Sequence, residues 1–250
     1  VQADRLLQPG RTLSWVRPPW REPEVPRSFA ILYQDEYLLG VAKPSGLPTL
    51  PGGGKFLENT LLSLVRRHYP EASPMHRLGR GTSGVVLFAL NRSARTEIAR
   101  AWRDGEVLKI YRALVSGSPA QDRFAVDIPI GLVPHPLLKN IHGASASGKP
   151  ARSEVTVLER RASSSLLEVR IATGRAHQIR IHLAAAGYPL TGEPLYASGG
   201  IPGPESTSLP SDLGYYLHSA LLGFHHPADG KWIEINCVPP PILRCGWSAG

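Results

Sequence analysis

The feature that most constrains the fold of this chain is a succession of short apolar segments of strand character, interrupted by only three helical patterns. The strand-type segments alternate in polarity or are continuously apolar, and turn residues separate them. They cover residues 30–33, 37–42, 85–89, 109–115, 151–158, 165–171, 215–224 and 231–238. Many strands with hairpin-like connections and few helices predict an α+β fold on a mixed, largely antiparallel sheet.

Three segments carry apolar residues at helical spacing. The first follows a capping residue, Asn59 or Thr60, and ends before Pro70. The other two cover residues 93–103 and 177–186, and the last closes on a glycine at the expected position. We expect these helices to flank the sheet.

The chain of 250 residues divides by composition into a short arm and one domain. Residues 1–27 are rich in Pro and Arg, which favours an extended arm that packs on the domain or touches a partner. Residues 28–250 show no second hydrophobic core and no internal repeat, so they predict a single domain. Its Gly- and Pro-rich stretch 196–210 is too long for a simple turn and predicts a surface loop.

Composition restricts the partner and the location. The formal net charge of +8 and the pI of about 9.8 favour a polyanionic partner, although a basic protein need not have one. No apolar run is long enough to cross a bilayer, and the start lacks a secretory signal, so we expect a soluble cytoplasmic protein without membrane contact. The two cysteines, Cys237 and Cys245, have no metal-site spacing, and we expect no metal.

A polar loop at residues 75–84 is the strongest local signal for a site. Gly79 and Gly81 lie among two arginines, a threonine and a serine, directly before an apolar strand. Glycines let backbone approach a ligand closely, and guanidinium groups bind phosphate. Composition alone leaves an ordinary Gly-rich turn as an equal alternative.

This loop resembles the HRLDxxTSG signature of RluA-type pseudouridine synthases. The matching residues are His76, Arg77, Leu78, Thr82, Ser83 and Gly84. The segments 31–48, 109–113, 148–151, 173–183, 217–219 and 226–227 resemble further motifs of the family, in the family's order. No single motif carries the likeness, which covers residues 29–240.

The resemblance implies a fold, a reaction and a set of site residues. These enzymes isomerise uridine in rRNA or tRNA to pseudouridine, breaking the bond from C1′ to N1 and joining C1′ to C5 without cofactor or metal. The resemblance implies a single domain with a central RNA cleft, a base flipped from its stack, and a monomer. Tyr111 matches the aromatic residue on the uracil, and Arg175 matches the arginine that pairs with the catalytic carboxylate. The residues expected to bind RNA are His76, Arg77, Arg80, Thr82, Lys109, His177 and Arg180.

The chain departs from the family pattern at Gly79, which stands where the family has its catalytic aspartate. Glycine has no side chain that attacks carbon. One interpretation is that another carboxylate serves, with four candidates: Asp104, Asp122, Asp127 and Asp212. A second is a catalytically impaired RNA-binding protein or RNA chaperone of the same fold. A third is that the enzyme tolerates the change. The sequence thus predicts an RNA pseudouridine synthase, with the non-catalytic protein as the alternative.

Overall fold

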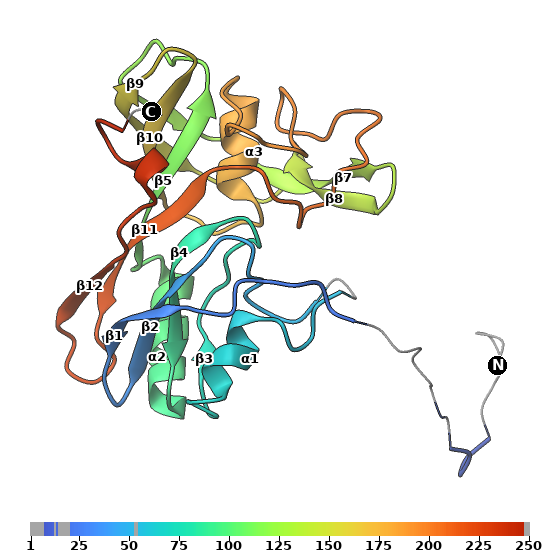
Figure 1. Ribbon diagram of the computed structural model, residues 1–250, viewed down its shortest axis with the longest axis vertical. Coiled ribbons are helices and arrows are strands. Elements are labelled where there is room, and N and C mark those ends of the chain that lie inside the picture. The colour runs from blue at the N-terminus through green and yellow to red at the C-terminus, as the bar shows by residue number, and fades with distance from the viewer. Residues whose placement is uncertain (1–7, 13, 15–20, 53–54, 248–250) are drawn as a thin grey trace.

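A computed structural model describes residues 8–12, 14, 21–52 and 55–247. Within these ranges the chain forms one ten-stranded sheet, a separate two-stranded sheet and three α-helices. Figure 1 shows the long strand β11 lying between the group β1, β2, β4 and the group β5, β10, β9. The architecture is the predicted α+β fold.

The large sheet is mixed and almost entirely antiparallel. Its main path is β1 (Ala30–Gln34), β2 (Leu38–Lys43), β4 (Ser83–Ala89), β11 (Leu217–His225), β5 (Leu108–Ser116), β10 (Ser164–Ile171), β9 (Ser153–Arg160) and β6 (Arg123–Val126). Off this path, β3 (Ser73–Pro74) pairs with β4, and β12 (Trp232–Asn236) pairs with β11. Among these pairs only β4–β11 is parallel.

The parallel junction of β4 and β11 determines which loops meet. Ser83 pairs with His218 and Gly84 with Ser219. Gly84 has a φ of +111°, and a Cβ on it would lie 2.2 Å from the Ser219 carbonyl oxygen, so only glycine fits this approach. Because parallel strands begin at the same edge, the loop before β4 lies beside the segment before β11.

The three helices cover both faces of the sheet. α1 (Leu61–Arg66) begins at Thr60, whose hydroxyl accepts a hydrogen bond from the Ser63 N–H. α2 (Arg92–Asp104) begins at an asparagine cap and ends at a left-handed glycine. α1 and α3 (Gln178–Ala185) contribute to the largest apolar cluster, and α2 packs in a second cluster with residues of β12. The three predicted helices are confirmed, with ends shifted by one or two residues.

A hairpin of two strands, β7 (Ile130–His135) and β8 (Lys139–Ala144), has no counterpart in the sequence-based expectation. Ile130 and Ile141 of this hairpin share a small apolar cluster with Ile181 of α3. Strand β6 and the 3-10 turn η1 (Pro241–Leu243) were also not predicted. The hairpin projects beside α3 in Figure 1.

Residues 21–27, the part of the arm next to the domain, pack on the domain. The Glu22 carboxylate accepts hydrogen bonds from the backbone N–H groups of Leu57, Glu58 and Asn59 at 2.8–3.0 Å. Val25 packs against the largest apolar cluster. The proline-rich residues 16–20 lie outside the described residues. No helix in the described part of the chain is long and apolar enough to cross a membrane.

Candidate active site

The loop before β4 is held rigidly by the segment that follows β2. The Gly46 N–H donates to the Arg80 carbonyl at 2.8 Å, and the Ser45 hydroxyl donates to the Gly81 carbonyl, also at 2.8 Å. The Arg80 Nε donates back to the Gly46 carbonyl at 3.1 Å. These hydrogen bonds join the loop, residues 76–82, to the segment that follows β2.

Two glycines of this loop face the ring of Tyr215, in the segment before β11. A Cβ on Gly79 would lie 3.0 Å from the Tyr215 Oη, and a Cβ on Gly81 would lie 2.8 Å from the Tyr215 Cζ. The Thr82 Oγ1 lies 3.4 Å from the same Oη. Gly79 itself is exposed, so the Tyr215 hydroxyl lies beside an open position of the backbone.

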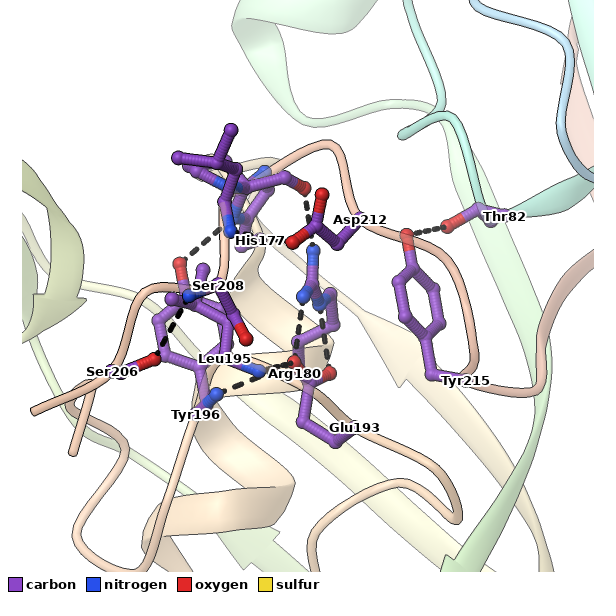
Figure 2. A network of polar contacts seen from close by, with 12 residues as sticks. Thr82, His177, Arg180, Glu193, Leu195, Tyr196, Ser206, Ser208, Asp212 and Tyr215 are labelled. Carbon is purple, nitrogen blue, oxygen red and sulfur yellow. Dashed lines mark hydrogen bonds and ion pairs between the residues drawn. The ribbon is translucent and has the colours of Figure 1, made fainter. Parts of the chain in front are cut away.

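A buried ion pair lies behind Tyr215 (Figure 2). The Arg180 Nε and one terminal nitrogen donate to the two carboxylate oxygens of Glu193 at 2.8 and 2.6 Å. The two side chains are only 3% and 1% exposed. The Arg180 Cζ lies 4.2 Å from the centre of the Tyr215 ring and 5.2 Å from that of Tyr196, an arrangement typical of cation–π contacts. Because it contacts one carboxylate and two aromatic rings, the planar guanidinium of Arg180 is held in one orientation.

Tyr111 lies on the same face of the sheet as Tyr215. It is in β5, pairs with Ser219 of β11 and is 9% exposed. Both tyrosines belong to the largest apolar cluster. Burial raises the pKa of Tyr111 to about 12, against a smaller opposite effect of its hydrogen bond with Ser219, so its hydroxyl stays protonated near neutral pH.

Arg175 is not the arginine that the sequence led us to expect beside position 79. Its side chain is exposed, and its Nε donates to the Pro150 carbonyl at 3.1 Å. The arginine that is buried with a carboxylate is Arg180, which the sequence suggested only as an RNA-binding residue. The two differ because Arg175 lies in the turn before α3, whereas Arg180 lies within the buried face of that helix.

Two of the expected RNA-binding residues are engaged inside the protein. The His76 Nε2 accepts the Leu87 N–H at 3.1 Å, and its ring stacks on Trp102 with 5.1 Å between ring centres. Burial, and secondarily the charge of Lys109, lowers the pKa of His76 to about 4. Lys109 is itself buried. These two residues stabilise the fold and do not present charge at the surface.

Of the remaining expected RNA-binding residues, Thr82 and Arg180 contact Tyr215, and His177 contacts Tyr196. His177 begins α3 with a φ of +54°, and its Nδ1 lies 2.7 Å from the Tyr196 hydroxyl. Burial lowers the pKa of His177 to about 3, and the positive charges of Arg180 and Arg77 add to the effect. His177 is therefore neutral, and exposed Arg77 lies close enough to influence it electrostatically.

Each of the four aspartates considered as substitutes has a partner within the protein. Asp104, Asp122 and Asp127 form exposed ion pairs with arginines. The Asp212 carboxylate accepts the Leu209 N–H at 2.8 Å, and Figure 2 shows it in the same network as Arg180 and Tyr215. The carboxylate that pairs with Arg180 is Glu193, which was not predicted from the sequence.

Tyr215 and Tyr196 were missed as well. Thr82 and Tyr215 are 133 residues apart, and no local pattern connects them. One described cavity, of about 440 Å³, is lined by residues 193–197 and 203–206. The other, of about 470 Å³, is lined by Arg152 and by residues of β6, β9 and β10. The loop 76–82 lines neither of them, so a central RNA cleft stays a prediction.

Comparison with known proteins identifies the family of this chain. Residues 37–185 match the family model described as RNA pseudouridylate synthase. An uncharacterized RNA pseudouridine synthase of Synechocystis is 46% identical over 95% of this chain and 82% of its own. The dual-specificity RNA pseudouridine synthase RluA of Salmonella typhi is 38% identical over 81% of this chain and 90% of its own. The solved structure of human RNA pseudouridylate synthase domain containing 1 superposes with a TM-score of 0.71 at 25% identity, covering 91% of both chains.

The fold of this chain thus has counterparts among RNA pseudouridine synthases. The chain belongs to the RNA pseudouridylate synthase family and is of the RluA type.

Proposed function

We propose that this protein isomerises a uridine to pseudouridine in ribosomal or transfer RNA. The observation that carries the proposal is the likeness to RNA pseudouridine synthases over nearly the whole chain, at up to 46% identity. The relatives do not favour a non-catalytic RNA-binding protein. Action as a monomer in the cytoplasm stays a prediction.

The chemistry needs a base that has left its stack and a group that acts on the ribose. Unstacking costs a few kcal/mol and is least costly in loops, so we propose a uridine in a loop as the target. Tyr111 belongs to the same apolar cluster as Tyr215, which supports our proposal that its ring packs on the flipped uracil. Exposed Arg77 and Arg175 are suited to hold phosphates on either side.

The experiment is to incubate the purified protein with ribosomal and transfer RNA transcribed in vitro, which carries no modification, and to map pseudouridine at single-nucleotide resolution. We expect one or a few new sites in loops. Binding of the same RNA, measured across a range of salt concentrations, runs in parallel. Salt-sensitive binding with no new pseudouridine at any enzyme concentration would overturn the proposal in favour of the non-catalytic alternative.

A further inference from the structure

The hydroxyl group of Tyr215 lies where a side chain at position 79 would begin. A Cβ on Gly79 would be 3.0 Å from the Tyr215 Oη. Position 81 must also be glycine to leave room for the Tyr215 ring, because a Cβ there would lie only 2.8 Å from the Tyr215 Cζ. Since heavy atoms of side chains rarely approach this closely, the two glycines and the tyrosine fit as one unit.

This phenol is held in one position. Its side chain is 5% exposed and belongs to the largest apolar cluster. Arg180 covers one face of the ring, and the Thr82 hydroxyl lies 3.4 Å from the Oη. Arg180 is fixed in turn by Glu193 and by the Pro210 carbonyl, to which it donates at 3.0 Å (Figure 2). Positioning at this level is what a reacting group requires.

Glu193 is not suited to take the place of the aspartate. One of its oxygens accepts from Arg180 and from the N–H groups of Leu195 and Tyr196, and the other accepts from the Arg180 Nε. Because both of its oxygens accept from Arg180 and its side chain is 1% exposed, Glu193 orients Arg180 and is closed to a substrate.

We propose that Tyr215 is a catalytic residue, and that its Oη forms the covalent bond to ribose that the family's aspartate would otherwise form. This inference rests on the proposed function. Tyrosine serves as the nucleophile in some enzymes that cleave glycosidic bonds, so a phenol is chemically competent for this step.

The reaction balances without a further reactant. The Tyr215 oxygen attacks C1′ as the bond from C1′ to N1 breaks, and the phenol proton passes to N1. The released uracil turns so that C5 faces C1′. C5 then attacks C1′, the bond from C1′ to the tyrosine oxygen breaks, and the departing phenolate takes the proton from C5. Two displacements at C1′ retain its configuration.

Open space at position 79 is consistent with this role. Gly79 is exposed, so no side chain at position 79 lies between solvent and the Oη. The ribose would approach across the backbone of the loop, and the uracil would lie toward Tyr111 on the same face of the sheet. Gly79 then permits catalysis by another residue and does not abolish it.

The test compares Tyr215→Phe, which removes only the hydroxyl, with Tyr216→Phe as a matched control. Tyr216 is the next residue and is 40% exposed. We expect the single-turnover rate of pseudouridine formation to fall at least about 100-fold in Tyr215→Phe, the usual scale for losing a positioned reacting group. RNA affinity and thermal unfolding should stay near those of the wild type, and the control should match it in all three.

A second measurement separates chemistry from packing. Replacing Tyr215 by 3-fluorotyrosine makes the phenol more acidic with almost no change in shape, and should move the pH dependence of the rate to lower pH. An active wild type with an equally active Tyr215→Phe variant, or an unmoved pH profile with fluorotyrosine, would overturn the inference and leave the proposed function intact. A wild type that forms no pseudouridine would instead overturn the proposed function.

Discussion

The guanidinium carbon of Arg180 lies 4.2 Å from the centre of the Tyr215 ring. Among the residues that the structure describes, Tyr215 is the tyrosine whose hydroxyl borders Gly79, and this buried cation covers its ring. Arg180 comes from α3 and Tyr215 from the segment before β11. The contact joins parts of the chain that carry separate sequence motifs, and the stability of the site depends on it.

The ion pair of Arg180 and Glu193 should be among the most sensitive points of the fold. Glu193→Gln leaves the buried guanidinium without its anion, and we expect the free energy of unfolding to fall by about 3–5 kcal/mol. Urea unfolding measures this. The control is Glu97→Gln, which removes an exposed partner of Arg100 and should change stability much less. Equal losses in the two variants would contradict the structure.

Gly84 should tolerate no larger residue. In Gly84→Ala the new Cβ meets the Ser219 carbonyl oxygen at 2.2 Å, at a φ that non-glycine residues avoid. We expect a loss of about 3 kcal/mol or more in the free energy of unfolding. Gly174→Ala is the control, because nothing lies within 4 Å of its Cβ position and it should change stability little. A thermally stable Gly84→Ala protein would show that β4 and β11 are not paired in this register.

Acid should destabilise the protein partly through His177. The pKa of His177 is about 3 in the folded state and near 6.5 in the unfolded state, so between these values the unfolded state binds the additional proton. Stability therefore falls as the pH falls from about 6.5 towards 3, by at most about 1.4 kcal/mol per pH unit from this group.

In His177→Asn this part of the pH dependence should disappear, and asparagine accepts the left-handed backbone of the position. The experiment is urea unfolding at a series of pH values, with His68→Asn, at an exposed site, as the control. A slope that is the same in both variants and in the wild type would count against a partly buried, neutral His177.

Arg175 and Arg77 should contribute to RNA binding and not to the chemical step. Each is exposed, and we expect either alanine variant to weaken RNA binding and to reduce the salt dependence of log K by about 1. The rate at saturating RNA should change little. Filter binding across salt concentrations and single-turnover assays measure the two effects. A large loss of the saturated rate in Arg175→Ala would restore the role that the family resemblance implied for it.

The elements that the sequence predicted correctly have strong local signals. α1 follows a threonine cap, α2 ends on a left-handed glycine, and β1 and β2 are joined by a polar turn. The hairpin β7–β8 has no such signal, because Pro134 lies inside β7. A proline normally argues against a strand, but the pairing of two edge strands in a small sheet tolerates it.

The site could be predicted only in part, for a topological reason. The glycine-rich loop and the α3 segment are local motifs, so Gly79, Thr82 and Arg180 were found from sequence. Tyr215 lies in no motif, and only the parallel pairing of β4 with β11 brings it to Gly79. The choice between Arg175 and Arg180 likewise depends on which side of α3 is buried, and the sequence motif contains both.

The most direct test places a carboxylate at position 79 and removes the hydroxyl of Tyr215, singly and together. We expect Gly79→Asp alone to be slower than the wild type, because its Cβ meets the Tyr215 Oη at 3.0 Å, and we expect Tyr215→Phe alone to be slow for lack of the hydroxyl. The double variant regains a reactive oxygen without the clash, so its single-turnover rate of pseudouridine formation should exceed that of both single variants. A double variant no faster than Tyr215→Phe, although folded and able to bind RNA, would contradict the account.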